Sequence, residues 1–244
     1  MLGGRALLMQ AAHPLVAAGI VDHSRYRQEP WRRLARTMTA LYTIVFGGRA
    51  EADRMGAIVQ AVHRRVVGER DGRRYSAADP ELMLWVHSTL VDTGLAMYET
   101  YVAPVAPVVA EEFYEQMKTV ATVFGAPPDV HPRTLADFRA YQREMLATGT
   151  LRVGADALAV AQSVLEPPVP LALRPALRAL VLANVGLLPE PLREQYGLSW
   201  SRAHGALFAA SSRSTRRLVV PLLPRELRRT ERLPLRVLTA FARL

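Results

Sequence analysis

Hydrophobic side chains recur along much of the chain with the spacing of one face of an α-helix. In residues 31–46 and again in residues 50–67 they stand three or four positions apart, and each run is closed by glycine. Asp79 and Pro80 then form a helix start, with aspartate as the cap and proline as the first helical residue. Residues 81–102 are apolar almost all round, which is typical of a central, buried helix.

The remaining sequence continues this pattern in shorter segments. Helical spacing predicts further helices at about residues 107–124, 134–148, 154–165, 173–187, 199–211 and 234–243. The breaks between them are short and contain proline, and no segment shows sustained strand alternation. We therefore predict an all-α fold, organised as one compact helical domain over residues 1–244.

Composition narrows the chemistry that such a domain could perform. Half of the residues (50%) are hydrophobic and 22% are charged, which excludes a disordered chain. The chain has no cysteine, so disulfides, zinc–thiolate sites, iron–sulfur clusters and cysteine nucleophiles are excluded. Any metal must be held by histidine, carboxylate, tyrosine or methionine side chains.

The net charge of +9 comes from arginine, since Lys118 is the only lysine. The arginines are spread along the chain and accompany no recognition module, so a nucleic-acid partner is not expected. Residues 211–234 are denser in proline and arginine, a pattern that fits a solvated face or a surface that contacts an anionic membrane or a partner. We find no cleavable signal and no apolar run of membrane-spanning length, and expect a cytoplasmic protein. The oligomeric state is not indicated.

Three histidines lie within apolar helical patterns: His13, His63 and His87. Because Pro14 disfavours helical backbone at the residue before it, His13 is expected where a helix kinks or begins. The alternative is a structural histidine whose ring nitrogens are satisfied by nearby backbone. The other histidines are expected in loops or at an exposed helix start, where they carry little information: His23, His131 and His204.

The histidine pattern favours haem over a compact metal site. The sequence holds neither HExxH nor His-x-His, and no carboxylate stands at helical spacing within the same turn, so a zinc or di-iron site is poorly supported. Isolated histidines on separate apolar helices instead suit haem, which needs an axial imidazole, a large apolar slot and arginines for its propionates.

Five blocks of sequence, in this order, resemble a known family. They read ALLMQAAHPLVAAGIVDHSRY, RRLARTMTALYTIVFG, AVHRRVVG, YSAADPELMLWVHSTLVDTGLAMYE and FRAYQREML. They are similar to successive blocks of the bacterial domain-of-unknown-function family that is grouped with MpaB-type oxygenases and with latex-clearing protein, the rubber oxygenase. The resemblance is strong over about residues 3–150 and holds in outline beyond them. It implies an all-helical fold, a b-type haem, and oxidative cleavage by dioxygen of carbon–carbon double bonds in apolar, isoprenoid substrates.

Carried over residue by residue, the resemblance implies that His63 is the axial ligand of the haem iron. Arg33 and Thr37 resemble the family's haem-pocket pair. Thr37 would then hydrogen-bond inside the pocket, and Arg33 would hold a propionate or orient His63 through a shared partner. His13 would lie on the distal side or at the pocket wall. His87 remains the competing ligand, or else a buried, hydrogen-bonded histidine that braces the site.

In two places the chain departs from the rubber oxygenase. Arg36 takes the position of the lysine that can cap the iron in that enzyme, and arginine cannot readily lose a proton. No distal glutamate is found in residues 7–24, where the polar candidates are Gln10, His13 and Asp22. Rubber itself is therefore not the expected substrate. The chain also begins almost inside the first block, so a helix that often precedes it in relatives is expected to be missing or to lie upstream.

Two other classes of protein remain open. One is a haem-binding sensor or carrier without turnover, which would share His63 but consume no dioxygen. The other is a helical interaction protein without a cofactor, in which the histidines are only core residues.

Overall fold

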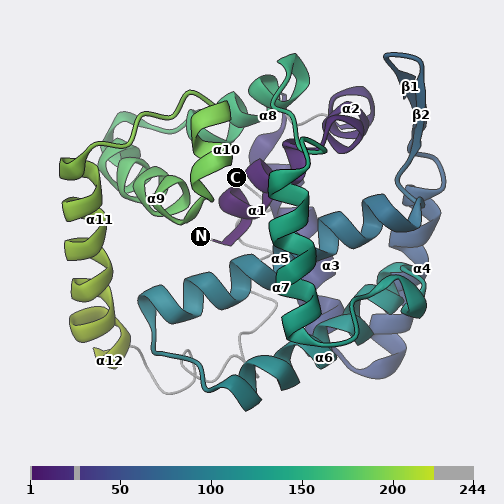
Figure 1. Ribbon diagram of the computed structural model, residues 1–244, viewed down its shortest axis with the longest axis horizontal. Coiled ribbons are helices and arrows are strands. Elements are labelled where there is room, and N and C mark those ends of the chain that lie inside the picture. The colour runs from purple at the N-terminus through teal and green to yellow at the C-terminus, as the bar shows by residue number, and fades with distance from the viewer. Residues whose placement is uncertain (1, 25–27, 223–244) are drawn as a thin grey trace.

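The computed structural model describes residues 2–24 and 28–222, and most of this backbone is helical (Figure 1). The prediction of an all-α fold is confirmed, whereas the helix predicted at 234–243 lies outside the described residues. The main elements, in chain order, are α1 (Leu2–Ala11), α2 (Pro14–His23), α3 (Pro30–Phe46), α4 (Arg49–His63), β1 (Val67–Arg70), β2 (Arg73–Ser76), α5 (Pro80–Tyr101), α6 (Pro107–Phe124), α7 (Leu135–Ala147), α8 (Ala155–Leu165), α9 (Arg174–Leu187), α10 (Glu190–Gln195), α11 (Arg202–Ser214) and α12 (Val220–Leu222). The short turns between them are 3-10 helices at Pro128–Val130 and Leu171–Leu173 and a π-helical turn at Thr215–Val219.

Local chemistry sets the ends of several helices. The side chain of Asp79 accepts hydrogen bonds from two free backbone N–H groups at the start of α5, at 2.9 and 3.2 Å. α11 begins three residues later than predicted because the Ser201 side chain caps it. α6 ends at Gly125, whose φ of +101° is a left-handed conformation that glycine adopts without strain.

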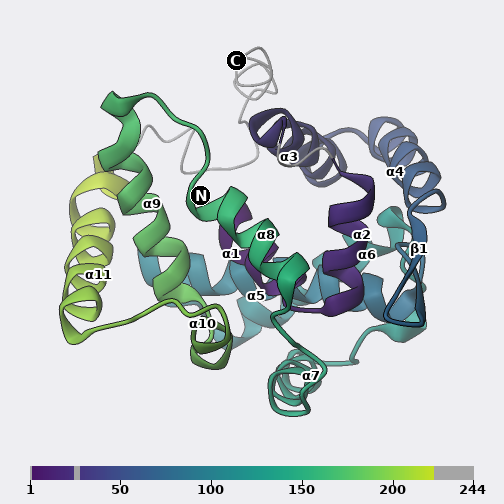
Figure 2. The same ribbon diagram turned by 90° about the horizontal axis from the view of Figure 1, so that it is seen from above.

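α5 is the central helix, and α1 packs along it (Figures 1 and 2). Leu8 and Met9 of α1 and Trp85 of α5 are fully buried in one cluster, to which α8 and the α10 region contribute. The pair α3–α4 and the β-hairpin lie on one side of this centre, and α9 and α11 lie on the other. The burial pattern therefore agrees with the prediction that residues 81–102 form a buried helix.

α1 and α2 meet at a sharp bend of 111°. His13 is the N-cap of α2 and Pro14 is its first helical residue, which confirms that His13 lies where a helix begins. Among the described helices, none is by itself long and apolar enough to span a membrane; α1 and α2 reach that length and composition only together, as this bent pair.

A β-hairpin occupies the end of one predicted helix. The helix predicted at 50–67 ends at His63, and β1 then pairs with β2 in antiparallel register. Asp71 and Gly72 form the turn with φ angles of +52° and +73°, as in a type I′ turn. Tyr75 is buried and packs the hairpin against α2. Each strand is only four residues long, so no alternation reveals it, and the Asp-Gly pair is the one local signal.

The side chain of Arg5 joins three helices, although only 4% of it is exposed. Its guanidinium donates to the carbonyl of Leu187 and to the hydroxyl of Thr93, both at 2.7 Å. A third hydrogen bond, at 2.5 Å, goes to the carboxylate of Asp92. The backbone N–H of Arg5 donates to the side-chain oxygen of Asn184 at 2.7 Å. One buried cation therefore holds α1 against α5 and α9 through charge-assisted hydrogen bonds.

Replacing Arg5 by methionine should lower the free energy of unfolding by about 3–5 kcal/mol, because the carboxylate of Asp92 and its buried polar neighbours lose their partner. Urea unfolding followed by circular dichroism measures the change. Arg139→Met, at an exposed position of α7, is the matched control and should cost less than about 0.5 kcal/mol. A loss below about 1 kcal/mol in the Arg5 variant would contradict this role.

Candidate functional site

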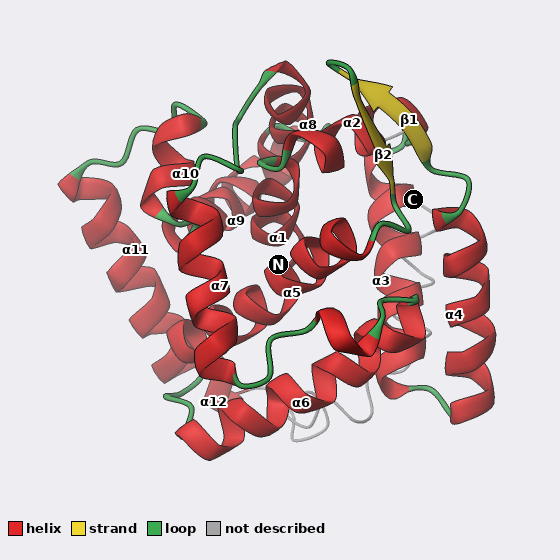
Figure 3. Cartoon of the chain, turned by 45° about the vertical axis from the view of Figure 1, so that its right-hand side comes forward, coloured by secondary structure: helices red, strands yellow, loops and turns green. Residues whose placement is uncertain are grey.

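The predicted site residues of the second and third sequence blocks lie on α3 and α4, which pack against each other as an antiparallel pair (Figure 3). Gly47 and Gly48 link the two helices. A Cβ atom at Gly47 would collide with the carbonyl oxygen of Thr43, so only glycine fits this tight link. Residues at equal distances from such a link lie level with each other. His63, at the end of α4, is therefore level with the first turn of α3, which carries Arg33.

His63 lies on the buried face of its helix. Ala52 and Gly56 are buried on that face, and the Gln60 side chain donates to the carbonyl of Val123 in α6 at 3.0 Å. Positions three and four apart share one helix face, so His63 continues this row. α4 therefore presents the imidazole on the side where α6 packs, rather than to solvent.

Burial favours the neutral form of the His63 imidazole, and one ring nitrogen has no partner among the described residues. Its Nδ1 is buried and has no hydrogen-bond partner within the described part of the chain. Burial lowers the pKa of the ring below its usual value. A neutral imidazole is the form that binds a metal, because a fully protonated ring has no lone pair to offer. His63 thus fits the role of axial ligand to a haem iron.

The other residues of the second block differ in exposure. Arg33 is half-buried, whereas Arg36 and Thr37 are exposed. The hydroxyl of Thr37 donates to the backbone carbonyl of Arg33 at 3.0 Å, so it is engaged within its own helix. The structure brings Arg33 to the same end of the helix pair as His63 and places Arg36 and Thr37 one turn further along α3. Their roles in a haem pocket stay predictions.

Large apolar side chains are exposed on the same helix pair. With exposed fractions of 37–55%, they are Trp31, Leu34, Val45, Phe46, Ile58 and Val62. Trp31, Leu34 and Val62 lie toward the end of the pair that carries His63, whereas Val45 and Phe46 lie at the link. Apolar side chains at the end of the pair that carries an unpaired imidazole suit a haem, which needs both an axial nitrogen and apolar contact.

His13 lies at another junction, where the start of α2 meets β2 and the start of α5. Its side chain is 7% exposed, and its buried Nδ1 has no hydrogen-bond partner among the residues that the structure describes. Burial is the main cause that lowers its pKa to about 4; the charge of Arg73 lowers it as well, and that of Asp79 raises it. The alternative in which nearby backbone satisfies both ring nitrogens therefore does not hold for Nδ1. A distal position over a haem stays a prediction.

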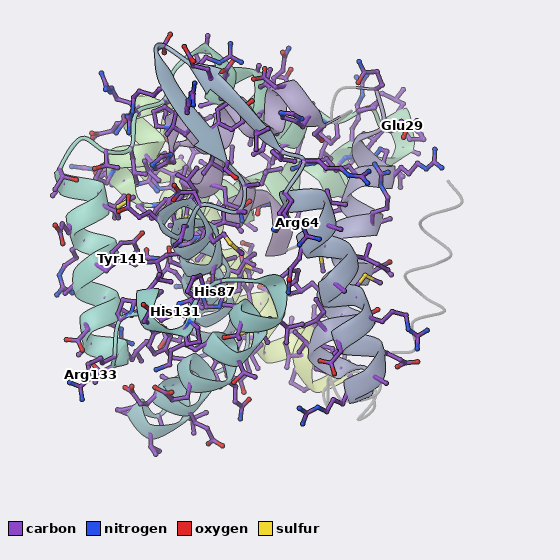
Figure 4. All side chains as sticks on the ribbon, turned by 90° about the vertical axis from the view of Figure 1, so that its right-hand side faces the viewer. Glu29, Arg64, His87, His131, Arg133 and Tyr141 are labelled. Carbon is purple, nitrogen blue, oxygen red and sulfur yellow. The ribbon has the colours of Figure 1, made fainter. Side chains whose placement is uncertain are left out.

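His87 of α5 forms a buried pair with His131 (Figure 4). The ring centroids are 5.1 Å apart and the rings meet edge to face. Nε2 of His87 lies 2.8 Å from the carbonyl oxygen of Met117 in α6, which is the hydrogen bond expected of a bracing histidine. Burial first, and then the neighbouring His131, lower the pKa of His87 to about 4, against the raising effect of this hydrogen bond.

The expectation that His131 carries little information was wrong. It lies in a loop, as predicted, but only 7% of it is exposed, and neither ring nitrogen has a hydrogen-bond partner in the described residues. Burial, followed by the charge of Lys118, lowers its pKa. A sequence signal was present: His131 precedes Pro132 as His13 precedes Pro14, and both imidazoles are buried.

Because His13 and His87 are held neutral, the free energy of unfolding should fall as the pH is lowered from about 6.5 toward 4. In the unfolded chain each ring binds a proton near its usual pKa of 6.5, whereas in the folded chain it does so only near pH 4. Each ring then contributes at most about 3 kcal/mol to the loss. Urea unfolding at about pH 7.5, 6 and 5 measures the slope.

Carboxylates also titrate toward the acid end of this range, so the comparison is between variants. His87→Gln should flatten the dependence between about pH 6.5 and 5 relative to the wild type. Equal slopes in the wild type and the His87 variant would contradict the burial of a neutral ring.

A family model described as "ER-bound oxygenase mpaB/B'/Rubber oxygenase, catalytic domain" matches residues 1–219. The match runs from α1 through the π-helical turn after α11 and includes α3, α4 and α5, which carry most of the candidate site residues. No curated protein and no solved structure is significantly similar to the chain. An oxygenase family indicates dioxygen and a small-molecule substrate as partners. The chain therefore belongs to the family of MpaB and rubber-oxygenase catalytic domains.

Proposed function

We propose that the protein is a haem-dependent oxygenase in which His63 binds the iron. The observation that carries the proposal is the His63 imidazole, which is neutral, half-buried and free at Nδ1, at the end of a helix pair with exposed apolar side chains. The bound haem would supply the iron at which dioxygen is activated toward a carbon–carbon double bond of an apolar substrate of the isoprenoid class. Membership of an oxygenase family supports this chemistry.

Arg33 would bind a haem propionate. It is half-buried and level with His63, and its planar guanidinium can donate two parallel hydrogen bonds to a carboxylate. Thr37 keeps acceptor capacity on its oxygen while it donates to the helix, so it would accept one hydrogen bond from a pocket group. Position 36 holds an arginine where the rubber oxygenase has a lysine, so no lysine from this position would compete with dioxygen for the iron.

The substrate side of the pocket would be formed by apolar residues and His13. The exposed apolar side chains of α3 and α4 would bind an apolar molecule and exclude water from it. His13 is buried and stays neutral across the physiological range, so one ring nitrogen can donate a hydrogen bond and the other can accept one. It would thereby orient a polar group without placing a charge in the pocket.

The purified chain, expressed with a haem precursor, should show a Soret band that shifts when the dithionite-reduced protein is exposed to carbon monoxide. That shift requires an iron with an exchangeable coordination position. Oxygen uptake with isoprenoid alkenes then tests turnover. The absence of a Soret band even after addition of hemin would contradict the proposal. A Soret band without oxygen uptake on any alkene would instead favour a haem-binding sensor or carrier.

His63→Ala should weaken hemin binding at least about tenfold and change the Soret band, because the proposed axial nitrogen is removed. Titration of the apoprotein with hemin, followed by absorption, measures the affinity. His87→Ala is the matched control: it also removes a buried imidazole, but it should lower stability while leaving the Soret band unchanged. If the His87 variant changed the spectrum and the His63 variant did not, the axial ligand would be His87.

A further inference from the structure

The net positive charge of the protein is confined to its last third. Residues 1–166 carry 18 Lys and Arg residues and 18 Asp and Glu residues, so their charges balance. Residues 167–244 carry 13 arginines and only 4 glutamates. The arginines themselves are spread along the chain, so it is the scarcity of carboxylates that leaves this third positive.

α11 and the helical turns after it present a row of exposed side chains over residues 203–222. Among the exposed positions of this segment, 203, 207, 210, 214, 218 and 222 stand three or four residues apart, as on one face of a helix. Leu207, Leu218 and Leu222 on this face have exposed fractions of 57%, 63% and 83%. Exposed Ala203 and Ala210 lie on the same face. We call these five residues the α11 stripe.

Arginines border the α11 stripe, and no acidic residue stands between positions 195 and 222. The exposed ones are Arg202, Arg213 and Arg217. Arg216 turns the other way: its guanidinium donates to the backbone carbonyls of Glu99 and Thr100 at the end of α5. This contact fixes the rotation of the helix and keeps the stripe on the outside.

The inner face of α11 is already packed. The ring of Phe208 packs edge to face against the ring of Tyr101. The Phe208 ring also lies so close to Gly186 of α9 that a Cβ atom at Gly186 would collide with it. α11 lies along the edge of the molecule opposite to α4 and the β-hairpin (Figures 1 and 2). Within the described residues, the α11 stripe is therefore an outer surface on the side away from the α3–α4 site.

We propose that the α11 stripe docks the protein onto the surface of an anionic lipid bilayer. A helix that carries exposed leucines flanked by arginines has the composition of helices that lie in the plane of a membrane interface. The leucines enter the boundary between headgroups and acyl chains, and the arginines bind lipid phosphates. The excess charge of residues 167–244 attracts the protein to the same surface.

Other occupants fit the stripe less well. A second copy joined by a two-fold axis would place the stripe against itself, so that arginine would face arginine with no carboxylate between them. A nucleic acid would use the arginines but leave the leucines against a polar backbone. An anionic bilayer uses both kinds of side chain. The inference concerns this surface alone and does not depend on the proposed haem chemistry.

The absence of cysteine allows a single-site label to test contact directly. Ala210→Cys places an environment-sensitive nitrobenzoxadiazole label in the middle of the stripe. Val108→Cys places it on α6, at a residue that is 73% exposed and precedes two glutamates. With vesicles of phosphatidylcholine and about 30 mol% phosphatidylglycerol, we expect a blue shift and brighter emission at position 210 only. Vesicles of phosphatidylcholine alone, or about 0.5 M salt, should abolish the change.

Matched variants test whether the leucines carry the binding. Leu207→Gln combined with Leu218→Gln should weaken flotation of the full chain with the anionic vesicles at least about tenfold, because two apolar side chains no longer enter the bilayer. Val108→Gln combined with Val109→Gln changes two exposed apolar residues elsewhere and should leave flotation unchanged. Circular dichroism establishes that both variants are folded.

Three results would overturn the proposal. The first is no flotation with anionic vesicles. The second is equal flotation of the wild type and the leucine variant, which would assign binding to arginines outside the stripe. The third is a label at position 210 that is already shielded in the absence of vesicles, with sedimentation showing dimers that the leucine variant loses. That result would assign the stripe to a second copy of the chain.

Discussion

One buried cation positions the centre of the molecule. The guanidinium of Arg5 is a buried cation, and a buried charge must be matched by an opposite charge and by hydrogen bonds. α5 supplies the opposite charge through Asp92, and α9 supplies the carbonyl of Leu187. α1 is thereby fixed in height and rotation. α2 begins at its N-cap His13, directly after α1, so the position of α1 determines where this bend lies. Gly3 of α1 packs close to Leu34 of α3. The elements that carry the candidate site are therefore positioned from this junction.

Burial affects the histidines in the opposite way, because an imidazole can give up its proton instead of requiring a counter-charge. Each buried ring keeps a lone pair, and its neighbours decide how that lone pair is used. Nδ1 is unpaired among the described residues in both His87 and His63, but His87 is also held at Nε2 by the carbonyl of Met117, a contact that His63 lacks. A neutral ring with a hydrogen-bond partner braces helices, and a neutral ring without one at an apolar surface is suited to bind a ligand. The same physical cause thus yields both kinds of residue in one fold.

Helix positions followed from the sequence because apolar spacing and caps are local properties. Residues 107–124 and the start of α5 at Pro80 agree with the prediction. The end of α4 does not agree with the prediction, because the apolar residues after His63 lead into a β-hairpin. Strand pairing and the burial of Tyr75 stabilise this hairpin, and neither is a local property of the sequence. His131 was missed for a similar reason: a loop position does not reveal that the loop is covered by α5 and α6. The family was predicted from five ordered blocks, and the match over residues 1–219 confirms it.

The first two thirds and the last third of the chain differ in net charge mainly because of where the carboxylates lie, since the arginines occur throughout. A net charge of +9 read over the whole chain points to no particular partner, because 18 acidic residues balance the first 166 positions. Only the last third lacks this balance, and there the exposed leucines of α11 stand among arginines. Electrostatic attraction alone would attach such a surface to any polyanion. Exposed leucines add a hydrophobic contribution to binding that is gained only when they enter an apolar phase. Arginines and exposed leucines together therefore favour a lipid surface over a nucleic acid.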